Sequence, residues 1–534
     1  MPNGKPFRIQ GRILALVLAA AGLSGCGAPN SKAALSPSGL DVESRLAEAG
    51  RAVARGSYAG FKRAAEIGRE LTALPRLKAK ERIAETYVRT LILLRTRERQ
   101  IGIVRSATTE TAKALIQAHP ALASYASLVD QAEWTSMRSR GIQTDIRTTA
   151  SPAHWTQKDF EKSLAEVKAK REAFRAKTAE DDFYAYSYLV FNASMTSMRE
   201  GAEDFAPIFA LFPESRLMKY LKATRYARED PELLKKLAAD DPEFHEAWLH
   251  LGELALGEGN LLSAEENFLK AEAGLADTPQ IPIYLASIYT ATEEFEKSLD
   301  YYEKTLALSP EYRDALLGKA ISLSSLGRRQ EAIAVLNRMV ELGNWLMGEA
   351  HYWLAWNRHA LGEDAIAQIH IEESKGRLPT NSEVFGLAGT IALELKQPER
   401  AETEFKEALK YNGGNIEALF GLGRIYDGRE RWQDAAVIYD VAAEVVGRSE
   451  KAIESKIAEI RAASMAEARR ARMIQKKESQ LRVARATRAT AFYGSAVDWF
   501  NGGFFDKARP AAEKAAAHPQ LKDKATALLD KMKK

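Results

Sequence analysis

Hydrophobic and polar positions follow a helical period along almost the whole chain, and between about His245 and Val446 the pattern repeats every 34 residues. In each repeat a small residue is followed by a second small residue and then, one helical turn later, by a large apolar one. Six units keep this register, with one extra residue before the fourth: Gly252, Ala264 and Phe268; Ala286, Ser298 and Tyr302; Ala320, Ala332 and Leu336; Ala355, Ala367 and Ile371; Gly389, Ala401 and Phe405; Gly423, Ala435 and Tyr439. The spacing predicts one helical hairpin per unit. Since no hairpin can bury its apolar face alone, we expect the units to stack into an all-α solenoid.

The repeat resembles the tetratricopeptide repeat (TPR) in its period and in its small and aromatic positions. The family's positions are occupied in the last unit by Leu419, Leu422, Gly423, Tyr426, Ala435, Tyr439 and Ala442, and in the first by Trp248, Leu251, Gly252, Ala264, Phe268 and Ala271. Pro310 and Pro379 stand at the family's inter-repeat proline, where a helix must stop. The resemblance implies six TPR units over residues 236–447 and a binding role, without naming the partner.

The first 26 residues have the pattern of an export signal. Lys5, Arg8 and Arg12 precede an apolar run from Ile13 to Leu23, which is too short to span a bilayer as a helix. The run ends in Leu-Ser-Gly-Cys, which resembles the bacterial lipobox, and Cys26 is the only cysteine of the chain. We therefore predict a lipoprotein signal over residues 1–25 and acylation of Cys26. The alternative is an ordinary signal peptide with an incidental cysteine.

This resemblance places the protein in a bacterial cell envelope, anchored by acyl chains that hold it stably only when two or more are present. Residue 27 is Gly rather than Asp, which by the enteric sorting rule implies the outer membrane, facing the periplasm. Residues 26–40 are rich in Pro, Ser, Gly and Ala and predict a flexible tether.

The composition is that of a globular chain. Of its 534 residues 46% are hydrophobic and 28% charged, which is too apolar for a disordered protein. Removing the three basic residues of the leader lowers the net charge from +4 to +1. The chain as a whole is therefore not basic, and nucleic acid is not an expected partner.

No motif for catalysis or for metal binding stands out. His245 and His250 flank a sequence like the HExxH zinc motif, but they are five residues apart and fall on different faces of a helix. His351 and His359 have no obvious third ligand, and there is no P-loop or GxSxG. We expect no catalytic residues, no metal, no cofactor and no enzymatic activity.

Residues 41–235 are helical but less regular, and they fit either diverged repeats or a separate helical domain. The segment from Phe183 to Met198 is rich in aromatic residues and predicts a helix. Its rings fit the core between solenoid layers. The alternative is a small-ligand or lipid carrier, with a pocket near Tyr184 and Phe191.

The C-terminal part predicts one long helix from Glu450 to Thr490, within a basic segment of residues 448–490. Counting from Lys451, it holds 11 Lys and Arg against 4 Glu. It would either contact an anionic surface or partner, or be a solvated helix that packs by one apolar stripe. Residues 491–534 resemble a further repeat with a capping helix.

In TPR proteins the first helix of each hairpin lines a concave groove, and the resemblance assigns groove positions in this chain. The residues expected to contact an envelope protein or peptide partner are Leu249, Tyr352, Trp356, His359, Phe420 and Arg424. Aromatic anchors are frequent in interfaces. The alternative is that the extra residue before the fourth unit turns Tyr352 and Trp356 into core. Acidic residues near helix starts, Glu246 and Glu417 among them, are explained by the helix dipole.

Overall fold

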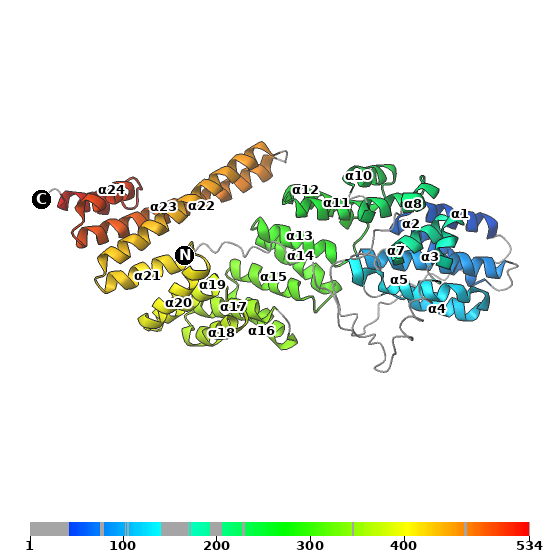
Figure 1. Cartoon of the computed structure of the whole chain (residues 1–534), viewed down its shortest axis with the longest axis horizontal. Coiled ribbons are helices and arrows are strands. Elements are labelled where there is room, and N and C mark those ends of the chain that lie inside the picture. The colour runs from blue at the N-terminus through cyan, green and yellow to red at the C-terminus, as the bar shows by residue number, and fades with distance from the viewer. Residues whose placement is uncertain are drawn as a thin grey trace. The chain divides into compact units, whose positions relative to one another are not determined.

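The computed structural model describes residues 42–74, 79–101, 103, 106–139, 169, 172–192, 206–226, 230–343, 346–463 and 467–532. Every regular element within these ranges is helical, as the sequence predicts (Figure 1). The chain forms two compact units that divide between Gly318 and Lys319.

The N-terminal unit begins with helices that do not follow the 34-residue period. They are α1 (Val42–Ala54), α2 (Tyr58–Thr72), α3 (Lys80–Gln100), α4 (Thr108–Ala118), η1 (Pro120–Tyr125), α5 (Ala126–Ser139), η3 (Lys177–Ala179), α7 (Asp182–Asn192), α8 (Ala206–Leu211), α9 (Arg216–Leu221), η4 (Lys222–Tyr226) and α10 (Pro231–Asp240). The aromatic segment is helical as far as Asn192, as predicted. Residues 140–168, which belong to the helical region predicted over 41–235, lie outside the described residues.

One hydrophobic core joins these helices to the first repeats. It runs from Phe61 of α2 through Leu91 of α3 and Tyr188 of α7 to Phe268 and Leu285 of the repeats. A domain with its own interior would have a core that stops at its boundary. The irregular helices therefore continue the packing of the array within this unit.

The repeated part consists of six hairpins, each of two helices. They are α11 (His245–Gly257) with α12 (Leu261–Glu272), α13 (Gln280–Ala291) with α14 (Phe295–Leu308), α15 (Arg313–Ser325) with α16 (Arg329–Leu342), α17 (Met347–Ala360) with α18 (Asp364–Arg377), α19 (Ser382–Glu394) with α20 (Pro398–Tyr411), and α21 (Ile416–Gly428) with α22 (Trp432–Ala462). The boundary between the two units falls within α15.

The turn inside each hairpin has one residue with positive φ at a fixed place in the repeat. These residues are Gly259, Glu293, Gly327, Gly362, Lys396 and Glu430, with φ between 59° and 76°. They are 34 residues apart except for a single step of 35, between Gly327 and Gly362. The extra residue found in the sequence therefore lies between the turns of the third and fourth hairpins, and it leaves the turn geometry of both intact.

The small positions of the pattern are where rings of the second helix meet the first helix. A Cβ atom on Gly389 would lie 2.5 Å from the ring of Phe405, and one on Gly423 would lie 2.6 Å from the ring of Tyr439. Side chains at such distances clash, so glycine lets the two helices approach. The second small residue, such as Ala401, is fully buried beside the ring.

The C-terminal end differs from the expectation of one helix from Glu450 to Thr490. Helix α22 ends at Ala462, Ala463 has extended backbone with ψ of 141°, and α23 runs from Glu467 to Asn501. The two long helices pack against each other as a hairpin (Figure 1). Helices α24 (Phe505–Ala516) and α25 (Lys522–Lys531) follow α23, where the sequence predicts a terminal repeat and its cap.

Ion pairs link the two helices of the basic segment. Glu454 of α22 pairs with Arg485 of α23 at 2.8 Å, and Arg461 pairs with Glu478 at 3.4 Å. These pairs offset part of the positive charge where the two helices face each other. The prediction of a single long helix missed this, because a helical period continues across the turn.

Candidate interaction surface and buried polar junction

Helices α17 and α21 carry all of the predicted groove residues except Leu249. Tyr352 and Trp356 of α17 are half-buried and rest on the core formed by Ala355, Ile371 and neighbouring residues. The ring of Trp353 lies edge-on to both, with centroids 5.5 Å from Tyr352 and 5.7 Å from Trp356. The two aromatic residues therefore belong partly to the core and partly to the surface, between the two alternatives set out for them.

An acidic patch adjoins Tyr352. Burial, together with the charge of Glu383, raises the pKa of Glu417, although Thr390 donates a hydrogen bond of 2.6 Å to its carboxylate. Burial and the charges of Glu417 and Glu383 likewise raise the pKa of Tyr352. Three successive first helices thus bring an aromatic ring and two carboxylates close enough to affect one another.

The other predicted groove residues of the C-terminal unit have different surroundings. Nδ1 of His359 lies 2.5 Å from the Oδ1 atom of Asp364. Phe420 is half-buried and packs edge-on against Tyr439, with ring centroids 5.7 Å apart. Arg424 is exposed. Of this group, Arg424 offers the most accessible charge to a partner.

The prediction that Leu249 lines an open groove is wrong. Its side chain has 0% exposure and belongs to the core shared with the N-terminal helices. The resemblance places this position on a concave face, but in the first unit that face is covered by the irregular helices of the same chain. The sequence pattern within α11 carries no sign of this covering.

A pair of carboxylates near the C-terminus was not predicted. Asp498 of α23 is 2% exposed, and burial together with a hydrogen bond to Asp427 raises its pKa to about 8. Nearby, Asp440 accepts hydrogen bonds from Ser495 at 2.6 Å and from the indole of Trp499 at 3.2 Å. No pattern in the sequence marks the pair of Asp427 and Asp498, because the two residues are 71 positions apart.

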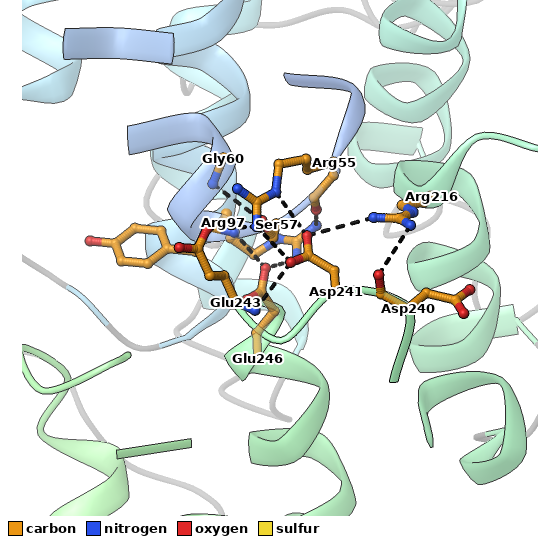
Figure 2. Close-up of polar contacts among 11 residues, drawn as sticks. Arg55, Ser57, Gly60, Arg97, Arg216, Asp240, Asp241, Glu243 and Glu246 are labelled. Carbon is orange, nitrogen blue, oxygen red and sulfur yellow. Dashed lines mark hydrogen bonds and ion pairs between the residues drawn. The ribbon is translucent and has the colours of Figure 1, made fainter. Parts of the chain in front are cut away.

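The most buried charges of the described residues lie in the N-terminal unit, at the junction between α2, α3 and α11 (Figure 2). Arg97 and Glu246 form an ion pair of 2.6 Å, and each side chain has 0% exposure. Glu246 also accepts a hydrogen bond of 2.7 Å from the backbone N–H of Tyr58, and Arg97 donates one of 3.1 Å to the carbonyl of Gly56. The guanidinium lies 3.8 Å from the ring centroid of Tyr220. The pair thus ties the turn before α2 to the start of the first repeat.

A second ion pair lies beside it, closer to the surface (Figure 2). Arg55 donates two hydrogen bonds to Asp241, of 3.0 and 2.6 Å, and Arg216 lies 3.6 Å from the same carboxylate. Although burial opposes it, the hydrogen bonds from Arg55 lower the pKa of Asp241. Together these contacts connect the residue after α1, the start of α9 and the end of α10, and they join α3 to the start of α11. Glu246 therefore has a specific partner as well as a favourable place near a helix start.

The aromatic residues of α7 pack as core. Phe183, Tyr186 and Tyr188 are all buried. The hydroxyl of Tyr184 lies 3.2 Å from that of Tyr125, and its ring packs edge-on against Phe183. The side chain of Phe191 lies outside the described atoms. This packing accounts for the aromatic cluster without a ligand.

The basic hairpin keeps its positive excess after its ion pairs are counted. Its glutamates at 450, 454, 459 and 478 each pair with a lysine or arginine of the same hairpin. Lys451, Arg472 and Arg482 remain exposed. Contact with an anionic partner stays a prediction for this hairpin.

Two further features bear on the predicted membrane anchor and metal content. None of the described helices is long and apolar enough to cross a membrane. Cys26 and the rest of the leader lie outside the described residues. Within the described ranges, no group of three or more His, Cys, Asp or Glu is placed to hold a metal ion.

Comparison with known proteins finds similarity for much of the repeated part. Residues 285–344 and 387–455 match the family model described as tetratricopeptide repeat. The human protein O-mannosyl-transferase TMTC1 is 26% identical over 226 residues, which are 40% of this chain and 25% of that protein. The TPR repeat-containing protein YpiA of Bacillus subtilis is 21% identical over 318 residues, 58% of this chain and 73% of that protein. A solved tetratricopeptide repeat protein from Parabacteroides merdae is 16% identical with a TM-score of 0.34, over 46% of this chain and 91% of its own.

Proposed function

Because the repeated part of this chain is a tetratricopeptide-repeat array, we propose that the protein is a binding scaffold that holds a protein or peptide partner against the first helices of its repeats. The observation that carries this proposal is the surface of α17, α19 and α21. Tyr352, Trp356 and Phe420 are each half-buried there and also pack on the core. Exposed parts of anchored rings contribute strongly to protein interfaces, because little conformational entropy is lost on binding.

The charges of this surface suggest which partner suits it. Negative charge at Glu417 is disfavoured by burial and by Glu383, so a cationic group brought near both would be stabilised. Apolar rings lie next to them. A segment with apolar side chains and one lysine or arginine fits this arrangement.

We also propose that the protein is anchored to the bacterial envelope through acyl chains on Cys26 and works at the outer membrane, facing the periplasm. This proposal rests on the first 27 residues: the basic start, the apolar run and the Leu-Ser-Gly-Cys sequence followed by Gly27. The human relative's transferase activity is not part of the proposal, since the alignment spans only 25% of that protein.

The partner is tested by in-cell crosslinking followed by mass spectrometry of the proteins that co-purify. Three variants are compared with the wild type: Tyr352→Ala/Trp356→Ala, Arg424→Glu and, as the matched control, Arg338→Glu. Arg338 is exposed as well, but it lies on α16, a second helix. Circular dichroism confirms that each variant is folded.

The proposal expects one discrete envelope protein with the wild type and with Arg338→Glu, and its loss with the other two variants. The same set of partners with all four proteins would contradict binding through α17 and α21.

The anchor is tested separately with Cys26→Ser. We expect the wild type to partition into the detergent phase after membrane extraction, and the variant to remain unprocessed or appear in the aqueous phase. If the processed variant entered the detergent phase as fully as the wild type, the acyl anchor would be overturned. The proposal for the binding surface would be unaffected.

A further inference from the structure

Two histidines face each other inside the fourth hairpin. His351 lies on α17 and His370 on α18, and their Nδ1 atoms are 3.1 Å apart. The ring centroids are 5.3 Å apart, with 31° between the ring planes. His351 is 8% exposed and His370 is half-buried. The sequence comparison of His351 with His359 missed this pair, because its members lie on opposite helices of the hairpin.

The distance between the two nitrogens fits a shared metal ion. Zinc binds imidazole nitrogen at about 2.0–2.1 Å and prefers tetrahedral geometry. Two nitrogens 3.1 Å apart would then subtend about 100° at the metal, close to the tetrahedral angle. A hydrogen bond between the rings is the other explanation. It requires one ring to carry its proton on Nδ1 and the other to leave Nδ1 free.

The electrostatic surroundings favour imidazoles that are neutral, which is the form that binds metals. Burial lowers the pKa of both histidines. The charge of Glu373 raises the pKa of both histidines. Arg377 lowers the pKa of His351, and Arg358 lowers that of His370. Arg358 is itself held by Glu363 at 2.5 Å, which offsets part of its charge. A cation between the rings would therefore be attracted by Glu373 and repelled by Arg377, for which the described part of the chain shows no ion pair.

Glu373 occupies the position one turn after His370 on α18. Residues three apart lie on the same face of a helix, so the carboxylate of Glu373 is within reach of the ring of His370 by a change of its own side-chain conformation. Glu373 is exposed, so its side chain has room to turn. As the side chains stand, no third ligand of the described part of the chain completes the set.

We propose that His351 and His370 bind one divalent metal ion of the zinc class through their Nδ1 atoms. Water fills the remaining positions, or Glu373 after a rotation of its side chain. The metal would fasten α17 to α18 directly beside Tyr352. It would thereby hold in place the helix that carries two of the aromatic residues of the interaction surface.

The test is titration of the full chain with Zn²⁺ by calorimetry, using protein purified with a histidine-free tag. The variants are His370→Gln, His351→Gln and Glu373→Gln. The matched control is His119→Gln, which removes a histidine from the other unit. We expect one Zn²⁺ per chain, binding weakened about tenfold or more by either histidine change, and a smaller loss for Glu373→Gln. His119→Gln should bind like the wild type.

Failure of the chain to bind one Zn²⁺ in a saturable manner, or unchanged affinity in His370→Gln, would overturn the site. His370 is half-buried, so this variant remains informative if His351→Gln does not fold. Nitrogen-15 spectra of the imidazoles give an independent result. Zinc should shift the Nδ1 resonance of both rings, whereas an Nδ1 proton that persists with Zn²⁺ present would show that the pair is only hydrogen-bonded.

Discussion

In the N-terminal unit, the fully buried ion pair of Arg97 and Glu246 joins helices that are distant in sequence. In the hairpins from α17 to α22, neighbours are joined by rings that rest on glycine, as Phe405 does on Gly389. The first arrangement depends on a unique pair, and the second recurs with the period of the sequence. A repeated contact can lose one member and keep its neighbours. The buried pair has no substitute, so the two regions should respond differently to substitution.

The largest expected effect comes from leaving a charge buried without its partner. Glu246→Gln removes the counter-ion of Arg97, and we expect a loss of about 3–5 kcal/mol in the free energy of local opening. Hydrogen exchange of the amides of α2, α3 and α11 measures it. Glu232→Gln is the control, because Glu232 is 80% exposed in its pair with Lys235. Unchanged protection in Glu246→Gln would mean that the pair does not hold the junction.

A double substitution sharpens the same point. Arg97→Met/Glu246→Leu replaces the ion pair by apolar side chains of similar size. Since replacing a buried pair is often far less costly than breaking it, we expect the double variant to be more stable than Glu246→Gln. Equal losses in the two variants would argue that shape, rather than charge, is what the junction requires.

Overpacking a ring contact should have a smaller effect. Gly389→Ala places a methyl group 2.5 Å from Phe405 and should cost about 1–3 kcal/mol in urea unfolding. Gly428→Ala is the matched control, because no atom outside its own helix lies within 4 Å. It should be neutral or stabilising by up to about 1 kcal/mol, since alanine favours helix. Equal losses in both would contradict the role of glycine at the crossing.

The buried aspartate of α23 predicts a dependence on pH. The pKa of Asp498 is about 8 in the folded chain, against about 4 when unfolded, so folding favours its protonated form. This stabilisation is complete below about pH 4 and is lost as the pH rises through 8. Asp498→Asn should therefore melt at a higher temperature than the wild type at pH 9, with a smaller difference at pH 5. The exposed Asp523→Asn should show neither change.

The smallest effect is expected at the turns. Lys396 has φ of 59°, which strains any residue with a side chain, so Lys396→Gly should gain about 1 kcal/mol. Gly362 occupies the same place in the preceding hairpin, and no atom lies within 4 Å of its Cβ position. Gly362→Ala should therefore lose about 1 kcal/mol of stability through backbone strain alone. Thermal unfolding of both variants measures this. The same sign of change in both would show that backbone strain does not decide the residue at this turn.

The sequence predicted the features that repeat. The spacing of Gly389, Ala401 and Phe405 predicted the hairpins, and the extra residue before the fourth unit reappears as the longer step between turns at Gly327 and Gly362. Such contacts lie within one repeat or between neighbours, so the periodic pattern encodes them. The irregular helices have no such pattern to compare.

What could not be predicted depends on contacts between distant residues. Arg97 lies in the charged run RTRERQ, which suggests a solvated face, yet its partner Glu246 is 149 residues away. The resemblance assigns Leu249 to a groove. The helices that share its core come from a region without the repeat, so the repeat pattern could not predict that they bury it. His351 and His370 became a candidate site only when the hairpin brought their nitrogens within 3.1 Å.

The most direct test of the account is a photo-crosslinking amino acid placed at position 424 and, in a second protein, at position 338. Both positions are exposed, one on the first helix α21 and the other on the second helix α16. Irradiation in cells should give one discrete adduct at position 424 and none at position 338. Equal adducts at both positions, or an adduct only at position 338, would contradict binding of a partner through the first helices of the repeats.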